Sequence, residues 1–233
     1  MALEAQWQSG YAADCKSVYL GSTPGCASNR YSLAFPLSPT RCHLMTDPLL
    51  HSDLTHWIAG TVKDSTPIQE FWLQRPGALT AGLRTLGDLR LRVSREYAAV
   101  LPQDEAALLQ TPIGSPIWVR EIVMDIRQID SVVARSITPL TASETVWRNM
   151  RFLQTRPLAD MLYHDADITR SAFFTARLQP SQPLRQAVNY ALPEFIKQND
   201  PLLARCSIFW RQQQPLLVEE CFLPKFWAIA TPS

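Results

Sequence analysis

The amino-acid sequence predicts an α+β fold that is built on a single, mainly antiparallel β-sheet. Segments with a two-residue hydrophobic period follow one another at short separations along the chain, as they do in β-hairpins. Helical patterns gather between these segments instead of alternating strictly with them. The composition, with 46% hydrophobic and 18% charged residues, is typical of a chain that buries a sizeable core.

Two helices are expected at the start of the folded region. Thr66 is placed to cap the first helix, Pro67 suits its first turn, and Gln69 completes a capping box. The Pro-Gly pair at 76–77 should end this helix. Leucines then recur at spacings of four and three, which predicts a second helix over 79–86.

Strand patterns dominate from residue 88 onward, because apolar and polar residues then alternate. A second capping box is expected from Thr141 to Glu144. The predicted strands cover residues 89–93, 116–126, 131–138, 206–211 and 216–223, and the helical patterns lie around 103–109, 142–150, 157–163 and 184–197.

Residues 1–60 are expected to form an irregular, poorly ordered extension, and residues 61–228 the folded domain. The extension is rich in Ser, Thr, Gly, Pro and Cys and lacks apolar periodicity. It also lacks the basic segment and apolar run of an export signal, and the whole chain lacks a stretch of about 20 apolar residues that could span a membrane.

Charge and cysteine content narrow the expected partners and location. A net charge of +1 provides no field for nucleic acid or an anionic membrane. Five cysteines without a C-x-x-C pair are read as free thiols in a reducing compartment. We therefore expect a cytoplasmic protein whose partner is a small molecule or another protein rather than nucleic acid. We also expect a monomer.

Three charged residues stand inside apolar strand faces. Arg120 shares its face with Ile122 and Met124, since alternate residues of a strand point to the same side. Arg135 and Glu220 are likewise flanked, two positions away on each side, by large apolar residues. All three side chains are expected to point inward.

Buried charges need partners, because an unpaired one costs several kcal/mol even after relaxation. One interpretation is a structural Arg–Glu pair within the covered sheet. However, two guanidiniums and one carboxylate do not cancel, and the arginine fork matches a ligand carboxylate with two parallel hydrogen bonds. We therefore predict that Arg120, Arg135 and Glu220 converge in a cavity that binds a small organic anion.

The sequence lacks the motifs of nucleotide binding, serine hydrolysis and zinc binding. The eight glycines form neither G-x-G-x-x-G nor a P-loop, and no G-x-S-x-G elbow occurs. The four histidines form no zinc motif with each other or with cysteine, so no metal site is predicted. His164 with Asp165 is interpreted as a solvated turn rather than a catalytic pair.

Six segments occur in the order of a known enzyme family: Pro76–Thr80, Trp118–Ile122, Ala134–Ser136, Thr155–Leu158, Ile168–Arg170 and Gln214–Pro224. On these segments, the chain from about Gln69 to Pro224 resembles the bacterial chorismate pyruvate-lyases, which start ubiquinone-ring synthesis. The resemblance implies an antiparallel sheet whose face is closed by helical flaps over a buried ligand. It also implies that chorismate is cleaved to 4-hydroxybenzoate and pyruvate without a cofactor or metal.

The resemblance assigns roles to individual residues. It places the family's substrate-binding arginine at Arg120, its backbone-contacting leucine at Leu158 and its pocket glutamate at Glu220. A family methionine falls on Leu79, and a second arginine falls on Arg135, which we expect to bind the other substrate carboxylate. Arg120, Arg135 and Glu220 are the expected catalytic residues.

The sequence also departs from the family pattern. Gln154 and Ala159 stand where the family usually has Gly, the Gln212–Gln214 turn lacks its usual Gly, and Cys206 replaces a common arginine. Two other functions stay open on sequence grounds: a ligand-binding sensor domain of the same fold, and an inactive homologue that keeps the pocket.

Overall fold

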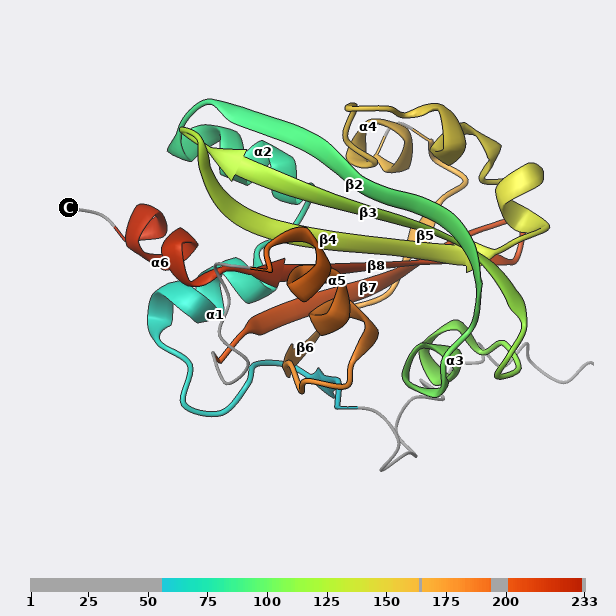
Figure 1. The fold of residues 1–233 in the computed structure, drawn as a ribbon, viewed down its shortest axis with the longest axis horizontal. Coiled ribbons are helices and arrows are strands. Elements are labelled where there is room, and N and C mark those ends of the chain that lie inside the picture. Colours follow the sequence, from blue (N-terminus) through green and yellow to red (C-terminus); the bar gives the residue numbers. More distant parts are fainter. Residues whose placement is uncertain (1–55, 164, 194–200, 232–233) are drawn as a thin grey trace, which may run out of the picture. The chain divides into compact units, whose positions relative to one another are not determined.

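The computed structural model describes residues 56–163, 165–193 and 201–231, which form one eight-stranded sheet with helices packed on it (Figure 1). The strand order is β1-β6-β7-β8-β4-β3-β2, and β5 pairs with β7. Every pair of strands in these ranges is antiparallel. The predicted α+β fold with a single antiparallel sheet is confirmed, whereas most of the expected extension, residues 1–55, lies outside the described residues.

One predicted strand, 116–126, has the predicted bounds, the other four are longer than predicted, and three short strands were not predicted. The strands are β1 (Ile58–Ala59), β2 (Leu89–Val100), β3 (Pro116–Ile126), β4 (Ile129–Pro139), β5 (Thr169–Arg170), β6 (Phe174–Arg177), β7 (Leu203–Arg211) and β8 (Gln214–Phe222). The helices are α1 (Pro67–Gln74), α2 (Leu79–Leu86), α3 (Gln103–Leu109), α4 (Ala159–Leu162), α5 (Pro183–Ala191) and α6 (Pro224–Ala230), with 3₁₀ turns η2 (Ala142–Glu144) and η3 (Arg148–Phe152).

Of the two predicted capping boxes, one forms in the structure and one does not. The Thr66 hydroxyl accepts from the Gln69 amide at 3.4 Å, and the Gln69 side chain accepts from the Thr66 amide at 2.9 Å, so the predicted box at α1 is confirmed. The box predicted at Thr141 is wrong. Thr141 is already helical there and its side chain makes no capping bond, so the segment forms 3₁₀ turns.

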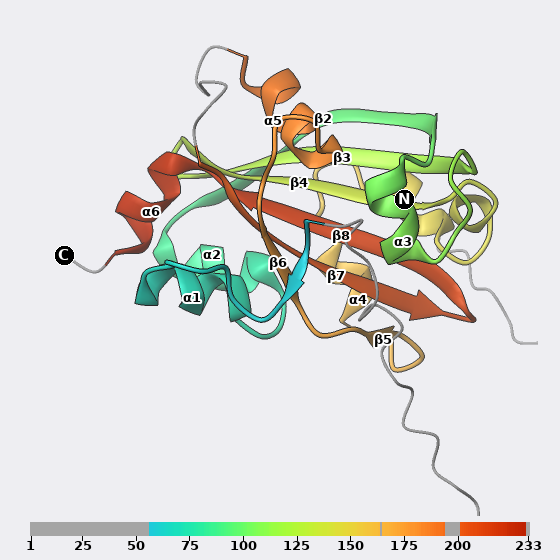
Figure 2. The ribbon, with the colours of Figure 1, turned by 90° about the horizontal axis from the view of Figure 1, so that it is seen from below.

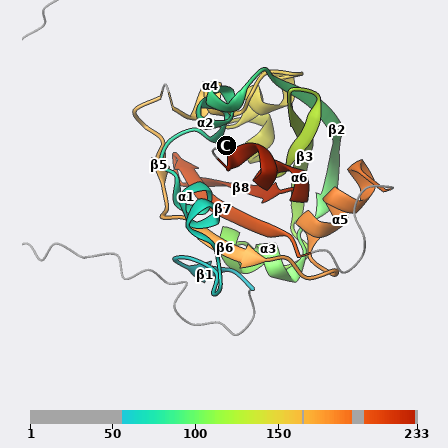
Figure 3. The same ribbon diagram turned by 90° about the vertical axis from the view of Figure 1, so that its left-hand side faces the viewer.

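Helices cover both faces of the sheet (Figures 2 and 3). The face that carries Ile122 and Ala134, which we call the cavity face, packs against α1, α2 and α6, with α4 further along. The face that carries Val123 and Val133, which we call the rear face, packs against α3 and α5. Alternate residues of the central strands are therefore buried on opposite sides.

A bulge in β2 changes which of its residues face the cavity. Before the bulge, Val93 lies opposite Ile122 of β3, and both residues belong to the core of the cavity face. The register shifts between Val93 and Arg95, so Glu96 comes to lie opposite Arg120. One extra residue in a strand reverses the alternation beyond it. The bulge thus gives Arg120 a carboxylate neighbour on an edge strand.

Helix α6 closes the cavity face near the end of the chain. Its Phe226 is fully buried and packs edge-on against Trp72 of α1, with 5.1 Å between the ring centroids. Burying such a side chain contributes about 1.5–3 kcal/mol, so this short helix anchors α1 to the sheet. No helix in the described ranges combines the length and apolar character needed to cross a bilayer.

Candidate active site

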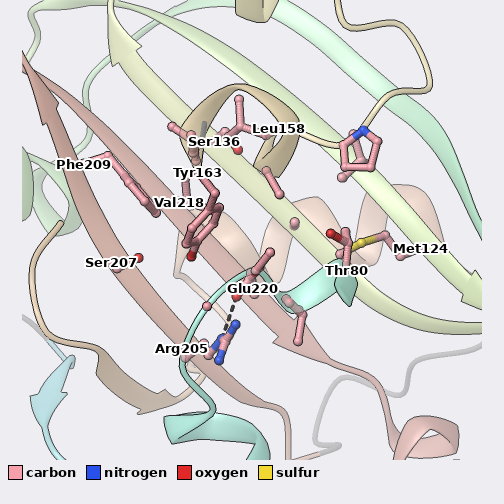
Figure 4. Close-up of a pocket in the computed structure, with 18 of the residues that line it drawn as sticks. Thr80, Met124, Ser136, Leu158, Tyr163, Arg205, Ser207, Phe209, Val218 and Glu220 are labelled. Carbon is pink, nitrogen blue, oxygen red and sulfur yellow. Dashed lines mark hydrogen bonds and ion pairs between the residues drawn. The ribbon is translucent and has the colours of Figure 1, made fainter. Parts of the chain in front are cut away.

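A small cavity lies between the cavity face of the sheet and the segments that cover it (Figure 4). Its volume is about 50 Å³. Ala134 and Val218 contribute from the sheet, Leu79 from α2, and Leu158 from the loop before α4. A water molecule needs roughly 10–15 Å³, so the space suits a few waters. A ring-sized ligand therefore requires the covering segments to move.

Glu220 is the carboxylate that lines this cavity, and Arg205 holds it. Arg205 Nε donates to Glu220 Oε2 at 2.6 Å (Figure 4). Arg205 Nη1 donates to the carbonyls of Trp72 at 3.1 Å and Arg75 at 2.9 Å, and its guanidinium lies 4.3 Å from the Phe173 ring centroid. These contacts fix Glu220 Oε2, and within the described ranges no hydrogen bond is seen to Glu220 Oε1 or from Arg205 Nη2.

Arg205 is the functional candidate that the sequence prediction missed. The predicted strand began at 206, one residue too late, so Arg205 was never assigned to a face. In the structure it lies two residues from Ser207 and four from Phe209, and all three line the cavity. Arg205 alternates with Ser207 and Phe209 in the sequence, so its face could have been predicted if the strand had been started at its true first residue.

Tyr163 adds a phenol to the same wall. Figure 4 shows its side chain directed toward Glu220 and Arg205. Burial raises the pKa of Tyr163 above its usual value of 10.0, and the nearby Glu220 charge adds to this, whereas Arg170 and Arg205 lower it. The hydroxyl thus stays neutral near pH 7 and can donate a hydrogen bond into the cavity.

Arg120 lies on the cavity face but is covered. It is 2% exposed and opposite Ser136, which lines the cavity. Its guanidinium pairs with Glu96 and donates from Nη2 to the carbonyls of Gln154 at 2.5 Å and Arg156 at 3.4 Å. The segment that continues to Leu158 therefore sits over the arginine. Arg120 adjoins the cavity without contributing to its lining.

Arg135 points to the rear face, so the prediction that it converges with Arg120 and Glu220 is wrong. Its neighbours Ala134 and Ser136 line the cavity, which directs Arg135 to the opposite side. Glu105 of α3 accepts from Arg135 Nε at 2.6 Å and from Nη2 at 3.1 Å. The sequence prediction failed because both faces are covered, so apolar neighbours show that a residue is buried but not on which side.

Arg135 belongs instead to a buried network of charges on the rear face. Glu121 accepts from Arg135 Nη1 at 2.7 Å and also pairs with Arg95 at 2.7 Å. Glu219 Oε2 lies 3.8 Å from Arg135 Nε. Burial lowers the pKa of Arg135, but the attraction of Glu105, Glu219 and Tyr97 together outweighs burial and raises the pKa above its usual value. The guanidinium stays charged and contacts the acidic side chains of Glu105, Glu121 and Glu219.

Glu219 is a member of this network whose charged form is disfavoured. Burial, and then repulsion from Glu105, raise the pKa of Glu219 well above its usual value of 4.5, although Arg135 opposes this. The folded protein therefore keeps a proton on Glu219 that the unfolded chain releases as the pH rises past about 4.5. Folding takes up a proton above that pH, so this group lowers stability as the pH increases.

Replacing Glu219 by Gln is expected to stabilise the protein near pH 8, because the amide keeps the shape and removes the proton uptake. We expect the melting temperature to rise by roughly 2–4 °C at pH 8, which corresponds to about 1 kcal/mol for a chain of this size. The difference should shrink toward pH 4. Thermal unfolding of both proteins across this range measures it. Equal melting temperatures at pH 8 would contradict the protonated state.

The departures from the family pattern leave the cavity wall intact. Gln154 and Gln213 adopt left-handed backbone conformations, with φ of 51° and 61°. Glycine reaches this region without the steric cost that a side chain imposes. Leu79 and Leu158 both line the cavity, whereas Cys206 is buried on the rear face. Gln154 and Gln213 hold their left-handed conformations at a modest cost in strain.

Comparisons with known proteins show the family of the chain. The family model described as chorismate lyase matches residues 52–231. Among solved structures, PhnF from Mycobacterium smegmatis has a TM-score of 0.46 at 11% identity, over 64% of this chain and 65% of its own. A "Probable chorismate pyruvate-lyase" from Bordetella pertussis is 52% identical over 174 residues, 75% of this chain and 91% of that protein. A "Probable chorismate pyruvate-lyase 1" from Pseudomonas fluorescens is 37% identical over 177 residues, 76% of this chain and 94% of that protein. On the family match and these two relatives, the chain belongs to the chorismate lyase family of enzymes.

Proposed function

We propose that the protein cleaves chorismate into 4-hydroxybenzoate and pyruvate, at the start of ubiquinone-type ring synthesis. The observation that carries the proposal is the Glu220 carboxylate, held by Arg205 at 2.6 Å in a mainly apolar cavity. The C3–O ether bond breaks, the hydrogen on C4 is lost as a proton, and the ring becomes aromatic. The departing enolpyruvate takes up a proton and becomes pyruvate.

Each carboxylate of chorismate requires a cation in this proposal. Arg120 binds the ring carboxylate once the covering segment has moved, because a guanidinium matches a carboxylate with two parallel bonds. Arg205 offers Nη2 to the enolpyruvyl carboxylate, the role that sequence reasoning had assigned to Arg135. Glu220 approaches the C4 hydroxyl, and Leu79 and Leu158 enclose the ring.

The protein contributes positioning and electrostatics to this reaction. Aromatisation supplies the driving force, so the site has to hold a reactive conformer and stabilise charge on the departing group. Arg205 and the neutral phenol of Tyr163 lie beside Glu220 and can donate to that charge. A mainly apolar wall strengthens such interactions, because less water screens them.

The direct test is to mix the purified full chain with chorismate and to follow both products. We expect 4-hydroxybenzoate, measured by absorbance after separation, and pyruvate, measured by lactate dehydrogenase coupling, in equal amounts. Chorismate incubated without protein corrects for spontaneous decay. Binding of chorismate without either product would overturn the proposal and select a sensor domain or an inactive homologue.

A further inference from the structure

Glu96 is the carboxylate that pairs with the buried Arg120. Its carboxylate pairs with Arg120 Nη1. The backbone carbonyls of Gln154 and Arg156 accept hydrogen bonds from Arg120 Nη2. Arg120 is 2% exposed, whereas the side chain of Glu96 is 26% exposed. Glu96 also belongs to β2, the edge strand of the sheet. The carboxylate can therefore turn toward solvent while the arginine stays buried.

If chorismate binds as proposed, charge balance requires Glu96 to leave Arg120 when a substrate carboxylate arrives. Arg120 and Arg205 supply two positive charges, and Glu220 with the two substrate carboxylates supplies three negative ones. Keeping Glu96 in place would add a fourth negative charge next to the incoming carboxylate. Like charges in a poorly solvated site repel strongly, so one of the two must leave Arg120. Of the two carboxylates, Glu96 has a path to water.

We infer that Glu96 is a positioning residue that competes with the ligand for Arg120, an inference that rests on the proposed function of this site. In the empty protein Glu96 neutralises the buried guanidinium and holds it in place. When a substrate or product carboxylate binds, Glu96 gives up Arg120, and it takes Arg120 back when the aromatic acid leaves. Glu96 thereby weakens ligand binding and promotes release of product.

The test is the affinity of the Glu96→Gln variant of the full chain for 4-hydroxybenzoate. A neutral amide competes poorly for Arg120, so we expect the Kd to fall by about tenfold, which calorimetry can measure. The ligand-free variant should melt at a lower temperature, because Arg120 has lost its charged partner, yet the ligand should raise that temperature more than in the parent. A purely structural role would lower both stability and affinity.

Two further variants isolate the effect. Asp130→Asn removes a partly exposed ion pair with Arg92 of the same strand, and it should leave the Kd within about twofold because this pair is far along β2 from Arg120. In an Arg120→Met background, Glu96→Gln should no longer tighten binding. Kinetics should show a lower KM in Glu96→Gln, with kcat reduced where product release limits turnover.

The outcomes separate this inference from the proposed function. If the parent turns over chorismate and Glu96→Gln binds 4-hydroxybenzoate no tighter than the parent, the competition is refuted and the function stands. If Glu96→Gln tightens binding but the parent forms no product, the competition stands and the lyase activity is refuted. Tightening that persists without Arg120 would also refute the competition, because Arg120 would not be the shared partner.

Discussion

Glu220→Gln is expected to lower kcat/KM for chorismate by about 100-fold or more. The carboxylate lines the cavity, and a positioned acid or base typically contributes 10²- to 10⁴-fold to a rate. Glutamine keeps an oxygen that can accept from Arg205 Nε, so the local geometry should persist while the charge is lost. Initial rates over a range of chorismate concentrations measure the effect.

The neighbouring residue provides a matched control for this prediction. Glu219→Gln makes the same chemical change one position earlier in β8, but on the rear face, and it should keep kcat/KM within about twofold of the parent. Thermal unfolding of both variants checks that each is folded. A Glu220→Gln variant within tenfold of the parent would contradict an obligatory proton transfer through Glu220. Equal losses in the two variants would point to a general defect of the strand.

Arg135→Met is expected to destabilise the protein by about 3–5 kcal/mol, because it leaves buried carboxylates without their common cation. Arg135 is 4% exposed and contacts Glu105, Glu121 and Glu219. Urea unfolding at pH 7, followed by circular dichroism, measures the loss.

A second variant tests the cause of this loss. Adding Glu105→Gln to Arg135→Met removes one of the unpaired charges, so it should recover part of the stability, since residues of one network are not additive. By contrast, if Arg135→Met unfolded at the same urea concentration as the parent and yet failed to bind chorismate, Arg135 would belong to the ligand site. That outcome would restore the assignment made from the sequence.

Hydrophobic patterning predicted the central strands because their many apolar residues mark them as buried, and both faces of this sheet are covered. Because both faces are buried, the sequence pattern does not show on which face a given residue lies. Arg120 and Arg135 both stand among apolar neighbours in the sequence, yet one lies next to the cavity and the other among carboxylates of the rear face. Separating them requires the register between β3 and β4, which depends on contacts distant in sequence.

Other parts of the site depended on features that a sequence pattern does not record. The bulge before Arg95 brings Glu96 to Arg120, and nothing in the alternation of β2 marks where the extra residue falls. The positions of Leu79 and Leu158 came from the family resemblance, and both residues line the cavity. Arg205 was missed because the predicted strand started one residue late.

Two consecutive glutamates of β8 lie in different environments, since Glu219 is on the rear face and Glu220 on the cavity face. The tight turn at Gln212 and Gln213, which joins β7 to β8, helps to set which carboxylate faces which side. A single-residue insertion or deletion in this turn would shift the pairing and exchange the two glutamates. Such a change would remove the carboxylate from the cavity and alter the charges of the rear-face network. Both the cavity and the rear-face network therefore constrain the length of this loop.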